Sequence, residues 1–226
     1  MLLEPDAENE VAYELCQLLG RAILPVRAAG GVGTAFFLAH PSGEFLLTAD
    51  AVTAAEVGEV GLRASVTEPA GVAGDVLVLP EFRSWWVRPP GLGVAIMRPD
   101  DLHGLAAERG WRWRLQPVPA TVAVRADEVA GFGAEPVTAI VLALGVGADG
   151  GRPLEVAVER AVRDGDGLRV TAALPTGYVG APVFGVRPDA AGEVGLRCLG
   201  LLLPGDTGHP VATLDRIVAA LPGGAA

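Results

Sequence analysis

The sequence contains no lysine, a single asparagine and only three serines, and these shortages exclude several catalytic chemistries. Without lysine the chain can form no lysine Schiff base, no serine–lysine dyad and no lysine-bearing P-loop. The serines are Ser42, Ser65 and Ser84, so the second half of the chain has no serine at all. Threonine is the remaining candidate for a hydroxyl nucleophile there.

Long apolar runs and cysteine clusters are also missing. No stretch of about twenty apolar residues occurs, which argues against a transmembrane helix. The first residues lack the basic and apolar regions of a secretory signal. The two cysteines, Cys16 and Cys198, have no metal-type spacing and form no disulfide framework. We therefore expect a cytoplasmic protein with reduced thiols, without a metal or a cofactor.

The charge is strongly acidic, with a formal net charge of −10 at pH 7. Nucleic-acid-binding proteins usually carry a basic patch, and the sequence shows none. Negative charge also disfavours anionic lipid surfaces. We expect neither nucleic acid nor a membrane among the partners.

Short apolar segments separated by turn residues run through most of the chain. Half of the residues are hydrophobic, and the 31 glycines and 18 prolines are spread rather than clustered. This pattern is typical of an all-β protein, which often reaches this length as one domain. Helical spacing is confined to 8–20 and 214–221, at the two ends. We predict short strands at 22–26, 34–39, 45–48, 60–66, 76–79, 93–97, 121–124, 137–144, 154–158, 168–173, 182–186 and 196–203.

Five short segments, each occurring once, follow one another in a characteristic order along the chain. They are Gly-Thr-Ala-Phe-Phe-Leu at 33–38, Leu-Leu-Thr-Ala-Asp-Ala-Val at 46–52, Gly-Val-Ala-Ile at 93–96, Gly-Tyr-Val-Gly-Ala-Pro-Val-Phe at 177–184 and Leu-Gly-Leu-Leu at 199–202. In order and spacing they resemble the bacterial and HtrA-type trypsin-like serine proteases. The resemblance covers roughly 21–221 and implies two packed six-stranded β-barrels with a cleft between them. We expect one unit over 1–226, with a helix at 1–20, barrels at 21–115 and 116–210, and a helix and tail at 211–226.

The same resemblance places the catalytic triad at positions that cannot perform its chemistry. Ala51 stands where the family has histidine, Gly93 where it has aspartate and Val179 where it has the nucleophilic serine. Alanine, glycine and valine can neither donate, accept nor orient a proton. His40, His103 and His209 lie outside the motifs, and no neighbour in the sequence is suited to activate Thr176. We therefore expect a pseudoprotease, not an enzyme.

The resemblance also indicates what such a protein would do. The family's cleft holds an extended peptide by strand addition, which needs backbone groups rather than a triad. We therefore expect a protein- or peptide-binding adaptor or regulatory subunit. Trypsin-like domains also occur beside ATPase or effector partners in bacterial conflict and signalling systems, and this analogy extends to an adaptor role there. A structural subunit and an enzyme with unrelated chemistry in the old cleft remain alternatives.

Candidate binding residues follow from this interpretation, in three groups. Glycines around the former nucleophile would supply backbone donors, adjacent tryptophans in a strand would put one ring outward, and the segment after the last motif would pair with peptide. Because proline lacks an N–H, Pro204 counts against such pairing and leaves an outer surface open as the binding face. The residues are Gly177, Tyr178, Gly180, Trp85, Trp86, Leu203, Pro204 and Gly205.

Three further features allow competing interpretations. The segment 145–150 matches the dinucleotide fingerprint, with Asp164 and Asp166 about twenty residues on, but alternating residues after it favour a hairpin turn over a helix. Asp149, Asp164 and Asp166 lack the spacing of an EF-hand calcium loop, so exposed turn aspartates are the preferred interpretation. The opening helix is expected to pack on a barrel, with a role as a free docking helix as the alternative.

Overall fold

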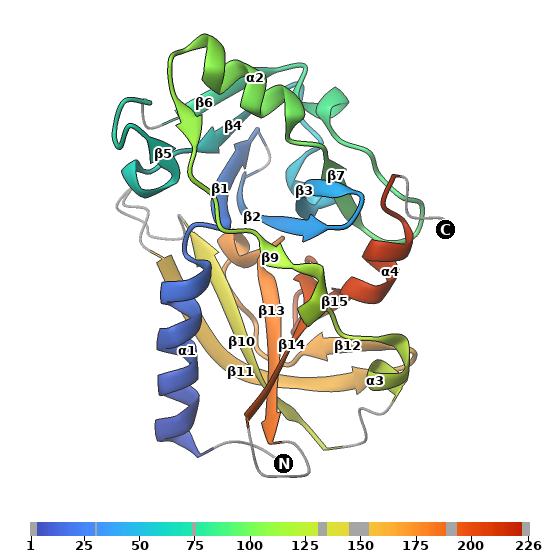
Figure 1. The fold of residues 1–226 in the computed structure, drawn as a ribbon. Helices are drawn as coiled ribbons and strands as arrows, with labels where there is room; N and C mark the ends of the chain where they lie inside the picture. The colour runs from blue at the N-terminus through green and yellow to red at the C-terminus, as the bar shows by residue number, and fades with distance from the viewer. Residues whose placement is uncertain are drawn as a thin grey trace.

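Two β-sheet units stacked on each other make up the protein, as Figure 1 shows. The structure, a computed structural model, describes residues 4–29, 31–73, 76–130, 135–144, 154–188 and 194–222. The first unit is a seven-stranded sheet ordered β6-β4-β1-β2-β3-β7, with β9 pairing parallel to β2. Its strands are β1 (Ile23–Ala28), β2 (Gly31–His40), β3 (Gly43–Ala49), β4 (Val57–Gly61), β6 (Val76–Pro80), β7 (Val94–Met97) and β9 (Val118–Pro119). A separate pair joins β5 (Thr67–Glu68) to β8 (Arg112–Trp113).

The second unit is a closed barrel of six strands in the order β10-β11-β12-β15-β14-β13. Closure leaves no free sheet edge, and each strand pairs antiparallel with both neighbours. The strands are β10 (Val137–Leu144), β11 (Leu154–Asp164), β12 (Gly167–Val170), β13 (Pro182–Pro188), β14 (Val194–Leu202) and β15 (His209–Thr213). The all-β fold predicted from the sequence is confirmed.

The first unit differs in detail from the expected six-stranded barrel. After β6 the chain leaves the sheet at Glu81, whose φ of 52° is left-handed, and enters a 3-10 turn over Phe82–Trp85. Only Val87 returns to β7, where it and Ile96 exchange two backbone hydrogen bonds of 2.8 and 2.9 Å. The first sheet is therefore an open path of six strands with β9 paired beside β2, and Val87 adds an isolated bridge to β7 without closing it into a barrel.

Some segment boundaries also differ from the predicted ones. β9 extends the first sheet beyond 115, and β15 continues the second barrel to Thr213, past 210. The predicted strands at 60–66 and 121–124 are partly 3-10 turns, over Ala64–Val66 and Ala120–Val122. Tight turns join β2 to β3 and β11 to β12 as predicted. The segment 145–150 lies outside the described residues, and β10 and β11 on either side of it pair antiparallel, as the hairpin interpretation requires.

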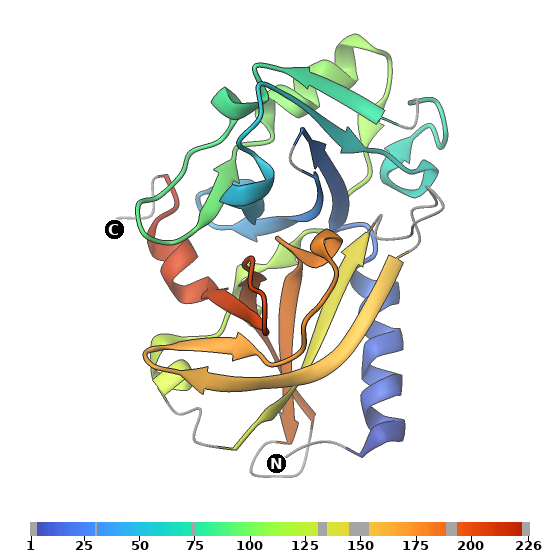
Figure 2. The ribbon, with the colours of Figure 1, turned by 180° about the vertical axis from the view of Figure 1, so that it is seen from behind.

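Helix α1 (Pro5–Leu19) packs on β10 and β11 of the second barrel, although it precedes the first sheet in sequence (Figures 1 and 2). Its buried face contains Ala12, Leu15 and Leu19. Glu8 is also buried, and its Oε1 accepts hydrogen bonds from Thr138 Oγ1 at 2.7 Å and Arg160 Nη1 at 2.9 Å. The helix is thus a packed element, as the preferred interpretation expected.

Three shorter helices complete the fold. α4 (Leu214–Ala219) lies against β14 and β15, as predicted for the C-terminal end. α2 (Asp100–Glu108) and α3 (Ala126–Ala130) were not predicted. Both carry two acidic residues in the first turn, a helix-start signal that short length and glycine at 104 obscured. No helix of the described residues is long and apolar enough to cross a membrane.

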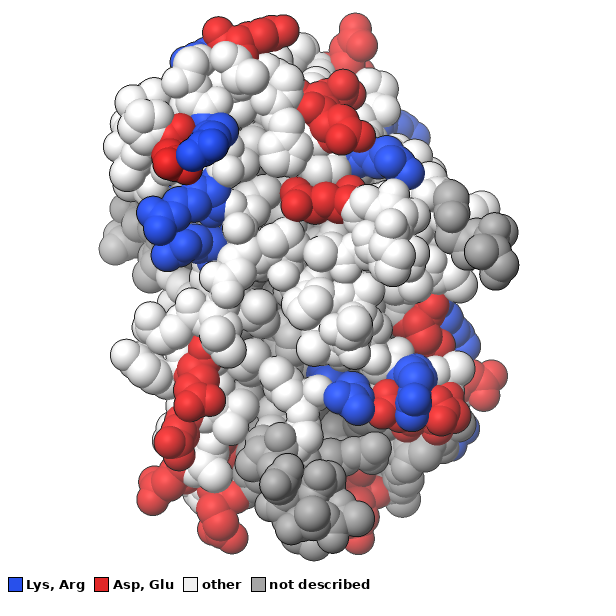
Figure 3. Space-filling view, in the orientation of Figure 1, with Lys and Arg blue, Asp and Glu red and all other residues white. Residues whose placement is uncertain are grey.

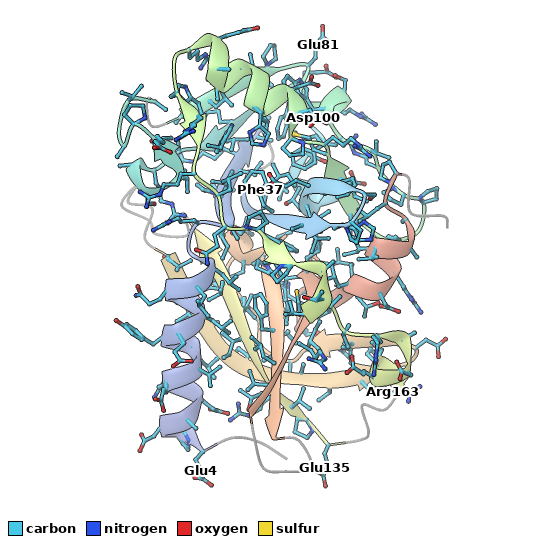
Figure 4. The ribbon with its side chains drawn as sticks, in the orientation of Figure 1. Glu4, Phe37, Glu81, Asp100, Glu135 and Arg163 are labelled. Carbon is cyan, nitrogen blue, oxygen red and sulfur yellow. The ribbon has the colours of Figure 1, made fainter. Side chains whose placement is uncertain are left out.

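A single apolar cluster joins the two units. Phe36 and Ile96 of the first sheet belong to the same buried cluster as Ile140 and Phe184 of the second barrel, together with Leu15 of α1. Further clusters fill the interior of each unit; Phe37 of the first one is marked in Figure 4. The units therefore pack as one body, and any site at their junction has a fixed geometry.

Candidate functional site

The three positions that the sequence resemblance assigned to the triad lie near the junction of the units. Ala51 is exposed in a 3-10 turn (Asp50–Val52) after β3, and Gly93 is exposed just before β7. Val179 follows a second 3-10 turn (Thr176–Tyr178) and is buried at 7 % exposure. Figure 2 shows both turns, light blue and orange, between the two units.

Backbone contacts hold these positions together. The Asp50 N–H donates to the Gly93 carbonyl at 2.9 Å, and the Thr34 N–H donates to the Val179 carbonyl at 2.9 Å. Gly33 lies where Val52 and Val179 meet, since a Cβ there would lie 2.5 Å from Val52 Cγ1 and 2.8 Å from the Val179 oxygen. The segments that carry Ala51, Gly93 and Val179 therefore lie against one another.

The amides around Val179 donate within the fold. The N–H groups of Tyr178 and Val179 donate to Pro175 and Thr176 at 2.9 Å, and that of Gly180 donates to Leu202 at 2.8 Å. Stabilising an oxyanion needs N–H groups that point at the ligand. The Gly180 amide is already bonded, so its expected role as a backbone donor has no support in the geometry. The carbonyl of the other expected glycine, Gly177, accepts from Thr34 Oγ1 at 2.8 Å.

The phenol of Tyr178 is uncharged at neutral pH because the side chain is buried. Its side chain is buried at 5 % exposure beneath the turn. Burial, reinforced by Glu155 and Glu159, raises the pKa of its phenol to about 12. The phenol therefore stays protonated at neutral pH and cannot serve as a base.

A leucine occupies the space beside Gly93. Gly93 has a left-handed φ of 68°, and a Cβ there would lie 3.3 Å from both Cδ atoms of Leu203. An aspartate at this position would be strained by its backbone and would face an apolar neighbour. Gly93 and Leu203 are thus brought together, and the leucine methyls would have to shift by a few tenths of an ångström to admit a side chain at position 93.

The expected peptide-pairing segment has its backbone groups engaged elsewhere. The Leu203 N–H donates to the Pro210 carbonyl at 2.8 Å, and the Leu203 carbonyl accepts from His209 Nδ1 at 2.9 Å. Pro204 has no N–H to offer. β14 ends at Leu202, before this segment, and Pro204 and Gly205 are exposed in irregular structure. Leu203 therefore cannot pair with an added strand in this conformation.

Histidine supplies no base at this site. His209 is buried, and the Leu174 N–H donates to its Nε2 at 3.0 Å, so Nδ1 carries the hydrogen that bonds Leu203. His40 Nδ1 bonds Ser42, and His103 lies 3.5 Å from a carboxylate oxygen of Glu44. Among the described residues, none of these histidine side chains is hydrogen-bonded to Ala51, Gly93 or Val179.

The tryptophans belong mainly to the core of the first unit. Trp86 is buried, with its ring edge-on to Phe82 at 5.6 Å between centroids. Trp85 is half-buried, and its Nε1 donates to the Pro80 carbonyl at 3.1 Å. The alternation argument did not apply here because Trp85 ends a 3-10 turn and is not in a strand.

The sequence did not indicate the hydrogen bonds that Arg88 makes to the turn that carries Ala51. Arg88 Nε donates to Asp50 Oδ1 at 2.6 Å, and its Nη2 donates to the carbonyl and hydroxyl of Thr53 at 2.8 and 2.9 Å. These bonds fix the turn that carries Ala51. Asp50 lies inside the motif at 46–52, and nothing in the sequence paired it with a residue 38 positions away.

The comparisons with known proteins concern the fold. No protein-family model and no curated protein matches the sequence. A crystal structure of Deg5 aligns over 99 % of both chains, with a TM-score of 0.59 and 14 % identity. The HtrA-type protease AlgW, solved with a tripeptide, aligns over 92 % of this chain with a TM-score of 0.51 and 18 % identity. A serine endoprotease from Yersinia pestis gives the same coverage and TM-score at 13 % identity.

This chain spans less than two thirds of the last two structures, 62 % and 64 % of their lengths. At these identities the similarity is one of fold, and it agrees with the strand order and the convergence of the five sequence motifs described above. The protein has the double-unit β fold of trypsin-like, HtrA-type serine proteases.

Proposed function

We propose that this protein is a non-catalytic protease-fold module that binds a protein or peptide as an adaptor or regulatory subunit. The observation that carries the proposal is the junction site itself. Ala51, Gly93 and Val179 stand together at one place in the fold, and none has a side chain that transfers or orients a proton. Asp50, the acidic side chain beside them, is bonded to Arg88.

The alternative of an unrelated enzyme in the old cleft has less support. Such an enzyme needs a cluster of titratable or metal-binding side chains. Among the described residues no group of three or more His, Cys, Asp or Glu is placed to hold a metal ion. We also propose a cytoplasmic location, to which the free thiols of Cys16 and Cys198 are suited.

The engaged backbone of Leu203 favours an outer surface over the cleft as the place where the partner binds. Strand addition needs unpaired N–H and carbonyl groups along an edge. Leu203 has both groups bonded internally, and Pro204 has no N–H. A cleft-bound peptide would first have to displace Pro210 and His209.

The purified protein is expected to show no protease activity. It should not cleave casein or chromogenic peptides, and a fluorophosphonate probe, which labels activated serines, should leave it unmodified. An active HtrA-type protease in parallel controls for the assay. Covalent labelling at one specific residue of this chain would contradict the proposal.

Rebuilding the triad is expected to leave the protein inactive. The triple change Ala51→His, Gly93→Asp, Val179→Ser restores the residue types, but catalytic groups must lie within about half an ångström of working geometry. An aspartate at position 93 would have to adopt a left-handed backbone beside Leu203. The Val179 N–H is bonded to the Thr176 carbonyl, so it is not free to stabilise an oxyanion. The measurement is chromogenic-peptide turnover, with Val179→Ser alone as the matched control. Turnover near that of the active protease would show an intact catalytic frame.

A further inference from the structure

Helix α1 presents a second apolar stripe that is only partly covered, with Val11 packed at its edge against the core and Leu18 exposed. One stripe, Ala12, Leu15 and Leu19, is buried. Residues three, four and seven apart share a helix face, so Ala7, Val11 and Leu18 form a neighbouring stripe. Leu18 is 54 % exposed, which is unusual for a leucine on a packed helix. This stripe is available for contact with another molecule.

A groove runs between this stripe and the second barrel. It has a volume of about 320 Å³, and its apolar lining comes from Val11, Leu15 and Leu18 of α1 and Leu196 of β14. That volume is at the small end for ligand sites. It suits one or two apolar side chains of a partner better than a cofactor.

The rim of the groove is acidic. Glu10 and Glu14 line it, and α1 has no lysine, arginine or histidine. Figure 3 shows acidic side chains following this helix at the lower left of the molecule, and Figure 4 marks Glu4 at its start. Arg160 lies under the helix, but it is bonded to Glu8 and belongs to the packed face.

The acidic rim of the groove favours a basic binding partner over a second copy of this chain. A second copy would place one acidic helix against another, between chains of net charge −10 each, and like charges across an interface are unfavourable. A segment with apolar side chains flanked by arginine or lysine would fill the groove and neutralise the rim. The Glu8–Arg160 bond holds the helix in place, so the surface is preformed.

We propose that the α1 groove, lined by Val11, Leu15, Leu18 and Leu196 and edged by Glu10 and Glu14, binds a basic amphipathic segment of a partner protein. This rests on the proposed function and names the surface and the partner's chemistry.

The test uses a phage library of random twelve-residue peptides selected on the intact protein. Enriched peptides are expected to combine leucine, isoleucine or phenylalanine with arginine or lysine. Fluorescein-labelled copies are then titrated by fluorescence anisotropy. Leu18→Glu is expected to weaken their binding at least tenfold, and Glu14→Arg several-fold, with the second effect reduced by added salt.

Matched variants separate the groove from general charge effects. Tyr13→Glu changes an exposed apolar residue, 67 % accessible, on another face of the same helix, and Glu108→Arg reverses a charge on α2. Both should leave the affinity within twofold. Melting temperatures of all variants confirm that each is folded.

Three results would overturn the proposal: no enriched peptide, enriched peptides without basic residues, or equal affinity for the wild type and Leu18→Glu. Self-association that Leu18→Glu abolishes, seen by light scattering, would identify a second copy as the occupant and would also overturn it. The proposed function fails separately, through covalent labelling by the fluorophosphonate probe. Loss of the groove proposal leaves another surface open for the partner.

Discussion

Gly180→Ala is expected to destabilise the protein by about 4 kcal/mol or more, or to prevent folding. A Cβ at Gly180 would lie 2.2 Å from the Thr34 carbonyl oxygen and 2.3 Å from Thr48 Oγ1. These atoms belong to β2 and β3, and Thr48 Oγ1 donates to the Thr34 oxygen at 2.7 Å. The clash therefore falls on the place where the second unit meets the first sheet, and neither side can move without breaking paired strands.

The left-handed backbone of Gly180, with a φ of 88°, adds strain to the clash. Gly110→Ala separates the two effects, because Gly110 has a φ of 77° and no atom within 4 Å of the added Cβ. It should cost only about 1 kcal/mol, the strain of a left-handed alanine. Urea unfolding followed by tryptophan fluorescence measures both variants. Equal losses would mean that the units do not meet closely at Gly180.

Raising the pH from about 9 to about 12 is expected to lower the free energy of unfolding by several kcal/mol, roughly 3–6. Burial raises the pKa of the Cys198 thiol from 9.0 to about 12, and it raises that of Tyr178 from 10.0 to about 12. As the pH rises through this window the unfolded chain loses first the thiol and then the phenol proton, while the native state holds both until about pH 12. Stability is therefore fully present below pH 9 and is lost as the pH rises toward 12.

The chain has no lysine, so no lysine ammonium titrates in this window. Burial also raises the pKa of the Cys16 thiol, which therefore adds to the loss of stability in the same direction and remains in the double variant. The double variant Cys198→Ala, Tyr178→Phe should show a much flatter dependence of the urea midpoint on pH, whatever its stability at neutral pH. Tyr13→Phe, which changes an exposed phenol, should keep the wild-type slope. A wild-type slope in the double variant would refute the assignment.

The sequence predicted the parts of the fold that depend on local pattern. Alternating apolar residues and turn glycines identified most strands, and the hairpin with Asp164 opposite Gly167 lies where expected. The motifs also fall in segments that the fold brings together, since the Asp50 N–H bonds the Gly93 carbonyl and the Thr34 N–H bonds the Val179 carbonyl. These predictions succeeded because strand period, turn residues and motifs can each be recognised from a few neighbouring residues.

The parts that failed depend on partners far apart in the chain. Nothing local indicated that Arg88 would bond Asp50, that Leu203 would cover Gly93, or that Pro210 and His209 would use the backbone of Leu203. Trp85 was misplaced for a related reason, since the left-handed Glu81 ends the strand before it. Long-range contacts of this kind follow from tertiary packing, which a single sequence does not display.

The bond between Glu8 and Arg160 spans 152 residues, and this separation sets an order of events during synthesis. The helix is made first, but its docking site on β10 and β11 is made only after more than half of the chain. An isolated helix of this length is marginal in water, and at about 5–20 residues per second the wait is roughly 10–30 s. The α1 groove also needs Leu196, so it forms only after residue 196 has been synthesised. A partner that recognises this groove would distinguish chains that extend past Leu196 from shorter nascent or truncated ones.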